Sequence, residues 1–253
     1  MEKLVENPFL PVNKTDKLFI GSAAKDFVYE LLGLGVNPIL INGKSALKVP
    51  LCGHIDMMVS HYGNNLFFID KFQIKAFNEL SKLGITVIKI NDVISENYPN
   101  DVKLNCVRIN KSLICNIKSV SKNIIEKAML DGLNIINVKQ GYTKCSLLIA
   151  NQNAVITDDE TVYSAMKHNY FDVLLVKKGS IDLPGYSYGF IGGCGGLISK
   201  NEMVFFGDIK KHDSYNNIKS FLNNYKIHIT SLSNKKLLDV GSIIPITECE
   251  DKL

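Results

Sequence analysis

The sequence predicts an α/β fold in which a strand, strand, helix, strand unit recurs around a closed ring. Three observations support this prediction: five short apolar segments each precede a good helix-capping residue, a helical pattern follows each cap, and a second apolar strand follows each helix. The 253 residues fit one domain, because closed repeat architectures keep chains of this length in a single unit.

The opening strand of each unit is a short apolar run that ends at a polar residue. The runs are residues 18–21, 66–69, 113–115, 154–157 and 204–207, and they are followed by Ser22, Asp70, Asn116, Asp158 and Asp208. Side-chain oxygens of these types accept the unpaired N–H groups of a first helical turn. We therefore interpret the three aspartates in this set as helix caps.

Each predicted helix leads into a second strand. Apolar residues at helical spacing continue to glycines such as Gly84 and Gly132, which favour helix C-termini. The strands that follow are residues 38–41, 87–90, 135–138, 173–176 and 227–230. Several of them are continuous apolar runs, a pattern typical of strands buried on both faces.

A third set of strands precedes the opening ones, at residues 55–60, 104–109, 145–150, 196–199 and 241–246. No helix follows the last of these strands, and the first unit lacks a strand of this type. We expect the C-terminal strand to pair beside residues 18–21 and close the ring, which removes an exposed sheet edge. The single domain, residues 1–253, then has units at 16–41 with 237–247, 48–90, 102–138, 143–176 and 193–230.

Composition argues against several classes of partner. The net charge is +4 and Arg108 is the only arginine, whereas nucleic-acid readers favour clustered arginines. No apolar run approaches the roughly 20 residues of a membrane span, and residues 1–12 lack the pattern of a signal peptide. The six irregularly spaced cysteines predict reduced thiols. We expect a cytoplasmic protein, monomeric or weakly homo-oligomeric, that binds neither membranes nor nucleic acid.

In architecture, nearly the whole chain resembles the pentein (β/α-propeller) superfamily. That superfamily contains arginine and agmatine deiminases, dimethylarginine dimethylaminohydrolase, amidinotransferases and a non-catalytic ribosome anti-association factor. Three segments are also similar to a small uncharacterised bacterial family within it: KQGYTKCS at 139–146, YGFIGG at 188–193 and GHID at 53–56. The resemblance implies a deiminase-like or amidinohydrolase-like cysteine hydrolase that acts on a guanidine or amidine small molecule.

The GHID segment carries the first candidate site residues, His54 and Asp56. Pentein hydrolases have a G-H-x-D or G-H-x-E element at the mouth of the ring, which implies that His54 is a general acid/base and that Asp56 holds a guanidinium nitrogen. Alternation along a strand would place both side chains on one face. The competing interpretation is a strand histidine whose hydrogen bonds are satisfied locally.

Cys145 and Cys194 are the candidate nucleophiles, because the resemblance implies a thiolate that attacks the guanidinium carbon. We favour Cys145, which follows a polar loop whose Gln140, Tyr142 and Lys144 are candidate substrate contacts. Cys194 lies among glycines, where the backbone can approach a ligand closely. Either cysteine is alternatively a small buried hydrophobe. Asp239, just before the closing strand, is the candidate second carboxylate.

The chain departs from the family pattern in one respect that supports a competing function. Most pentein enzymes carry their nucleophile in the last repeat, whereas the closing strand here offers only Ser242. The alternative is therefore a catalytically silent ring that binds a protein or ribonucleoprotein partner, as the anti-association factor of the same superfamily does.

Two further kinds of site lack support in the sequence. Cys52, His54 and Asp56 alternate along one predicted strand, but no second cluster of metal ligands accompanies them, so we predict no metal. The glycine-rich segment 189–196 matches neither the dinucleotide fingerprint nor the phosphate-binding loop. The hydrolase that the resemblance implies needs no metal or organic cofactor.

Overall fold

The computed structural model describes residues 2–250 and shows an α/β chain with several small sheets. Four of the sheets share one topology, in which an antiparallel pair of strands is extended by a parallel third strand. Their strands are β4 (Val59–Gly63), β5 (Leu66–Ile69) and β6 (Thr86–Lys89); β7 (Val107–Ile109), β8 (Ser112–Cys115) and β9 (Asn134–Asn137); β10 (Leu147–Asn151), β11 (Ala154–Thr157) and β12 (Asp172–Leu175); β14 (Gly195–Ser199), β15 (Glu202–Phe205) and β16 (His228–Ser231).

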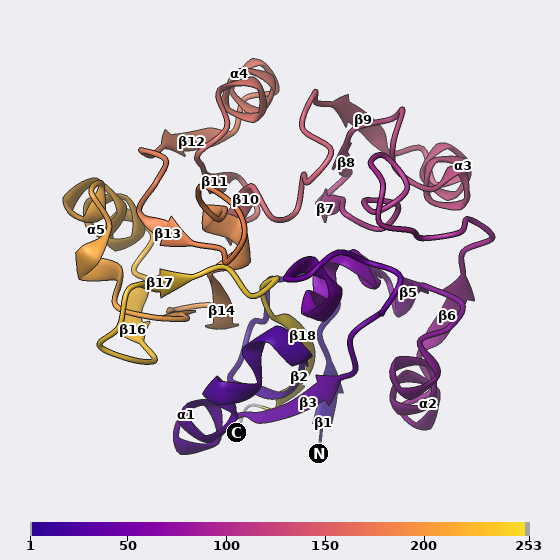
Figure 1. Cartoon of the computed structure of the whole chain (residues 1–253), viewed down its shortest axis with the longest axis horizontal. Helices are drawn as coiled ribbons and strands as arrows, with labels where there is room; N and C mark the ends of the chain where they lie inside the picture. The colour runs from indigo at the N-terminus through magenta and orange to yellow at the C-terminus, as the bar shows by residue number, and fades with distance from the viewer. Residues whose placement is uncertain (1, 251–253) are drawn as a thin grey trace.

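A helix connects the two parallel strands of each unit, as a parallel crossover requires. The helices are α1 (Val28–Gly33), α2 (Ile74–Lys82), α3 (Lys122–Leu130), α4 (Glu160–His168) and α5 (Tyr215–Asn224). Each helix buries one apolar face; on α2, for example, Ala76 and Leu80 are fully buried. Figure 1 shows the helices at the outer edge and the sheets around a common centre.

The fifth large sheet joins the two ends of the chain. Its order is β1 (Glu2–Leu4), β18 (Ile244–Cys249), β2 (Thr15–Gly21) and β3 (Asn37–Ile41), with β18 antiparallel to both of its neighbours. The C-terminal strand thus lies beside residues 18–21, as the sequence predicts. A short parallel pair, β13 (Ile181–Asp182) and β17 (Leu237–Leu238), brings Asp239 close to residues 183–190.

Four strands of the third set begin later than the sequence predicts, including the closing strand β18, which begins at Ile244 and not at residue 241. Residues 55–57 form a 3-10 turn, so that β4 begins at Val59. Likewise β7 begins at Val107 and β10 at Leu147, each after a hydrogen-bonded turn. The turns hold Asp56, Asn105 and Cys145, which would have been part of the sheets if the strands had begun where the sequence predicts.

Only part of the predicted set of helix caps is observed. Asp208 caps the 3-10 helix η5 (Ile209–Lys211), but Asp159, not Asp158, caps α4. Asp70 instead forms a buried ion pair with Lys44, at 2.8 Å, and Asp158 accepts a hydrogen bond from the Ile191 N–H. The remaining two differ as well: Asn116 accepts from the Lys118 N–H within a tight turn, and Ser22 makes no side-chain cap. The predictions failed because the chain turns for several residues before most helices begin.

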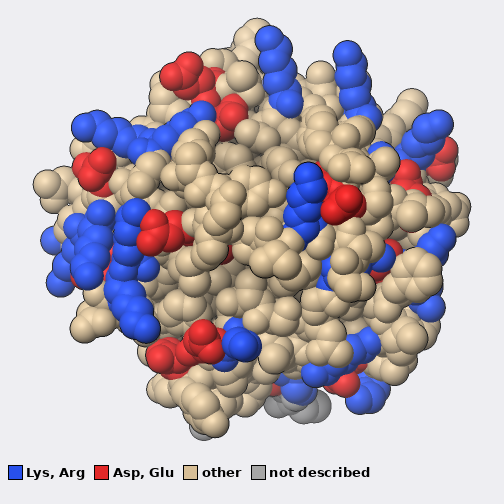
Figure 2. Space-filling view, in the orientation of Figure 1, with Lys and Arg blue, Asp and Glu red and all other residues tan. Residues whose placement is uncertain are grey.

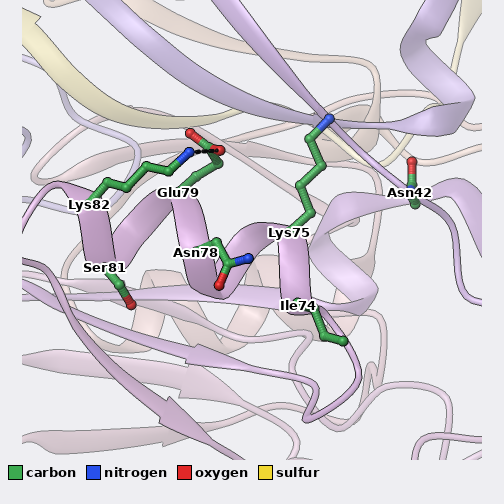
Figure 3. Close-up of a pocket in the computed structure, with 7 residues that line it drawn as sticks. All are labelled: Asn42, Ile74, Lys75, Asn78, Glu79, Ser81 and Lys82. Carbon is green, nitrogen blue, oxygen red and sulfur yellow. Dashed lines mark hydrogen bonds and ion pairs between the residues drawn. The ribbon is translucent and has the colours of Figure 1, made fainter.

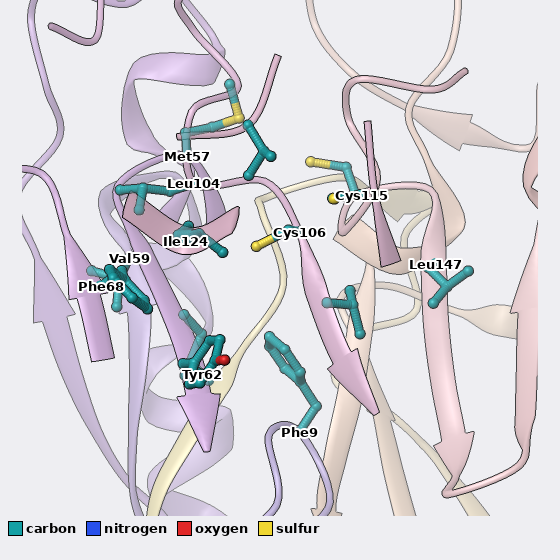
Figure 4. Packing of buried hydrophobic residues seen from close by; sticks show 14 of the residues in the cluster. Phe9, Met57, Val59, Tyr62, Phe68, Leu104, Cys106, Cys115, Ile124 and Leu147 are labelled. Atoms are coloured by element: carbon teal, nitrogen blue, oxygen red, sulfur yellow. The ribbon is translucent and has the colours of Figure 1, made fainter. Parts of the chain in front are cut away.

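The core lies between the units and on the inner sides of their strands. Buried apolar side chains from several segments form one cluster there, and Figure 4 shows part of it, with Phe9, Tyr62, Phe68 and Leu147 among the labelled residues. Charged side chains of both signs are interspersed on the face seen in Figure 2 and lie mostly toward its edge. Within residues 2–250, no helix is long and apolar enough to cross a membrane.

Candidate active site

Two short 3-10 turns position His54 and Asp56. The turns are η2 (Leu51–Gly53) and η3 (Ile55–Met57), and His54 lies between them with an extended backbone. Gly241, at φ +85°, packs its backbone against His54; a side chain there would meet the His54 Cβ at 2.5 Å. The two residues are therefore not on one strand, contrary to the sequence prediction, but the turns still bring both side chains to the centre.

Cys145 lies in the turn before β10, with its thiol against Asp56. The Sγ is 3.1 Å from Asp56 Oδ2. Asn105 Nδ2 is also 3.1 Å from this sulfur, and Asn105 Oδ1 accepts the backbone N–H groups of Lys144 and Cys145 at 2.7 and 3.3 Å. Asn105 thus fixes the turn that carries the cysteine and offers a donor to its sulfur.

His54 completes a compact group with Asp56 and Cys145. One candidate donor atom from each residue lies within 4.8 Å of the others, and all three residues are buried. A second carboxylate lies near the imidazole, since Asp239 Oδ1 is 3.7 Å from His54 Nδ1. Asp239 is held by the N–H groups of Phe190 and Gly241, at 2.9 and 3.2 Å. Neither ring nitrogen of His54 has a hydrogen-bond partner among the described residues.

Burial and neighbouring charges shift the pKa values of this group. Burial raises the pKa of Asp56 to about 6, although His54 and Lys144 oppose the shift. Burial, and then the carboxylates of Asp56 and Asp239, raise the pKa of the Cys145 thiol well above its ordinary value. Burial lowers the pKa of Lys144. Without a ligand the thiol is therefore neutral at pH 7, and a cation placed between the carboxylates would favour the thiolate.

A cavity of about 190 Å³ opens beside the cysteine. Its lining consists of Leu51, Tyr142, Cys145, Leu183, Tyr186, Ser187, Tyr188, Phe190 and Asp239. A second depression of about 310 Å³ reaches Asp239 from the side of His54. The broad depression along α2 in Figure 3, about 750 Å³, is lined by none of the candidate site residues, and its Lys82 is paired with Glu79.

The remaining predicted contacts lie in different places. Tyr142 and Asp239 line the cavity. Gln140 Nε2 instead donates to Asp159, and the Lys144 ammonium donates to Gly192 O and Ser242 Oγ at 3.0 and 2.8 Å.

Cys194, the other candidate nucleophile, lies outside the compact group. Its thiol donates to Ile191 O at 3.1 Å. It is not among the described residues whose donor atoms gather with those of His54 and Asp56.

Asn105 is the site residue that sequence reasoning missed. A positional signal existed, because Asn105 precedes β7 just as Cys145 precedes β10 and Asp56 precedes β4. No motif marks it, since an asparagine before a strand is usually part of a turn.

The same three side chains also offer nitrogen, oxygen and sulfur donors of the kind that bind Zn²⁺. In the sequence prediction the third potential ligand was Cys52. In the structure Cys145 takes that place, and Cys52 is not part of the group found among the described residues.

Comparisons with known proteins identify a family for the chain and similar structures for its fold. Residues 19–244 match the model of DUF6873, a family of unknown function, and a search of curated proteins finds no match. The structure is similar to inosamine-phosphate amidinotransferase from Streptomyces griseus, with a TM-score of 0.62 at 8% identity over 98% of each chain. It is also similar to the saxitoxin-pathway amidinotransferase from Microseira wollei, with a TM-score of 0.59 at 9% identity over 92% of this chain and 96% of that one.

A hydrolase with a different reaction has a similar structure. This is the dimethylarginine dimethylaminohydrolase from Pseudomonas aeruginosa in complex with citrulline, with a TM-score of 0.57 at 8% identity over 87% of this chain and 92% of that one. At such identities the likeness concerns the fold, and these neighbours are pentein proteins. The chain therefore belongs to the DUF6873 family and has the fold of the pentein superfamily.

Proposed function

We propose that this protein is a cysteine hydrolase that cleaves a C–N bond of a small guanidine or amidine. The observation that carries the proposal is the buried group of His54, Asp56 and Cys145, whose donor atoms lie within 4.8 Å of one another beside a cavity. A nucleophile, a base and a carboxylate at such distances meet the geometric demands of covalent catalysis on a cationic carbon. Pentein neighbours that modify guanidines support the same assignment.

In the proposed reaction His54 takes the proton of the Cys145 thiol, and the resulting thiolate attacks the guanidinium carbon and forms a C–S bond. A C–N bond then breaks, and ammonia leaves with a proton from His54. His54 next removes a proton from water, which attacks the same carbon; the C–S bond breaks and the thiolate is restored. The guanidinium and one water thus give a urea and an ammonium ion.

The carboxylates link formation of the thiolate to the binding of a cationic substrate. Burial, and then Asp56 and Asp239, raise the pKa of Cys145, so the free site holds a neutral thiol. A guanidinium that hydrogen-bonds to these carboxylates offsets their charge and lowers the cost of forming the thiolate. The nucleophile is then generated when the substrate is in place.

We also propose that the units form one ring, closed by β18, and that residues 1–253 are a single domain. The pairing of β18 with β2 supports this arrangement. So does the order of the units around the centre in Figure 1. A ring of this kind gives every unit a leading edge at the centre, which is where the candidate residues lie.

Turnover of simple guanidines tests the proposal. We expect release of ammonia from a panel of small guanidines and amidines, together with the matching urea from each guanidine and the matching amide from each amidine, and loss of both products in Cys145→Ser and His54→Ala. Cys249→Ser is the matched control, because Cys249 is exposed at the end of β18 and should keep full activity.

Acid quenching and mass spectrometry should reveal the amidino group on the peptide that contains Cys145. The proposal fails if the folded wild-type protein turns over no member of the panel, or if Cys145→Ser keeps its activity. In that case a silent ring that binds a macromolecular partner becomes the better hypothesis.

A further inference from the structure

The lining of the cavity beside Cys145 combines polar groups with aromatic rings. Cys145 and Asp239 supply a thiol and a carboxylate, against which the reacting carbon would lie under the proposed function. Tyr142, Tyr188 and Phe190 supply aromatic rings, with the Phe190 ring 6.1 Å from each of the other two between centroids. At about 190 Å³ the cavity is smaller than the roughly 300 Å³ at the lower end of typical ligand sites, so it suits a small molecule.

Within the described chain, no lysine or arginine lines this cavity. The ammonium of Lys144 is directed to Gly192 O, Ser242 Oγ and the Phe9 ring. Arg108 donates a hydrogen bond to the backbone carbonyl of Tyr62, and its guanidinium lies over the ring of the same tyrosine. Lys178 lies 5.8 Å from the Tyr188 ring but is exposed and outside the lining.

A ligand carboxylate would therefore enter the cavity without a cationic partner. Burying an unpaired carboxylate is costly, and sites that select carboxylates usually offer an arginine fork or an ammonium group. The one ionisable carboxyl group in the lining, Asp239, would add repulsion. Aromatic faces, in contrast, attract cations and pack well against short apolar chains.

We propose that the substrate is a guanidine or amidine carried on a short apolar arm without a carboxylate. This inference rests on the proposed function, because it assumes that the cationic group lies against Cys145 and Asp239. The arm then extends between Tyr142, Tyr188 and Phe190. Free guanidino acids, arginine included, are excluded by their carboxylate.

Propylguanidine and 4-guanidinobutanoate form a matched pair, since they differ only by the carboxylate. The Cys145→Ala variant cannot react. In calorimetry we expect it to bind propylguanidine at least about tenfold more tightly than 4-guanidinobutanoate, a difference of about 1.4 kcal/mol in binding free energy. Phe190→Ala in the same background should weaken binding of propylguanidine. Lys178→Ala should leave the preference unchanged. Equal binding, or tighter binding of the acid, overturns the proposal.

A gain-of-function variant tests the same point in folded protein. Ser187 lines the cavity and is exposed, so Ser187→Arg adds a cation without disturbing the core. We expect this variant to improve binding of 4-guanidinobutanoate relative to propylguanidine by about tenfold. An unchanged ratio argues against the arm lying in this cavity.

The two proposals fail in different ways. If Cys145→Ala prefers propylguanidine but the wild-type protein releases no ammonia from it, the binding class stands and the hydrolase fails. If the wild-type protein releases ammonia faster from the acid than from propylguanidine, the hydrolase stands and the substrate class fails.

Discussion

Replacing Asp56 by asparagine should speed alkylation of Cys145 while it abolishes turnover. The carboxylate lies 3.1 Å from the sulfur and helps to raise the pKa of the thiol. At this separation, and with an effective dielectric constant of about 20, the repulsion between carboxylate and thiolate is on the order of 5 kcal/mol. Relaxation of the surrounding dipoles reduces this figure, so we expect at least about a tenfold rise in the thiolate fraction at pH 8, equivalent to about 1.4 kcal/mol.

The assay is the rate of iodoacetamide labelling of the Cys145 peptide, followed by mass spectrometry from pH 5 to pH 9. Because the pKa of Asp56 is about 6, its carboxyl group is neutral below that pH, and the wild-type and Asp56→Asn rates should converge there. Asp208→Asn is the matched control, since Asp208 caps a distant turn. Labelling that is unchanged or slower in Asp56→Asn at pH 8 would refute the charge coupling.

Three further predictions follow from particular contacts. Asn105→Leu removes the donor to Cys145 Sγ, so kcat should fall by about tenfold to a hundredfold with little change in KM. Burial lowers the pKa of His61 to about 3. Protonation of His61 should therefore cost up to about 5 kcal/mol of unfolding free energy as the pH falls from 6.5 to 3, so in urea titrations the wild-type protein should lose stability over this range relative to His61→Phe, which can keep the stack on Phe67. Zn²⁺ should inhibit turnover by binding His54, Asp56 and Cys145, and a chelator should restore the activity. Cys145→Ser should weaken Zn²⁺ binding in calorimetry. Inhibition that persists after chelation would contradict a reversible site.

The repeating fold could be predicted because its signals are local. Apolar runs such as 66–69 and 154–157 are strands in the structure at the same residues, since their sequence pattern alone demands burial. The caps were less predictable. Asp158 and Asp159 are chemically identical, and only the geometry of the turn decides that Asp159 caps α4 while Asp158 bonds to Ile191.

The candidate site could be predicted only where a motif marks it. His54 and Asp56 were found through GHID, although by an argument about strand faces that the two 3-10 turns overturn. The choice between Cys145 and Cys194 depends on which thiol faces Asp56, a tertiary contact between distant segments. Asn105 carries no sequence signal beyond its place before β7, because its role exists only once the Cys145 turn packs against it.

The place of the proposed nucleophile along the chain has a physical explanation in the repeat. Asn105, Cys145 and Cys194 each stand just before the first strand of a unit, and Ser242 stands before β18 in the same way. Units related by such a repeat present equivalent positions to one centre, so the distance between reacting atoms matters and the order of the units does not. Ser242 is itself engaged by the Lys144 ammonium, at 2.8 Å, whereas the thiol of Cys145 faces Asp56. A nucleophile in an earlier unit is therefore compatible with the chemistry that the resemblance implies for the last one.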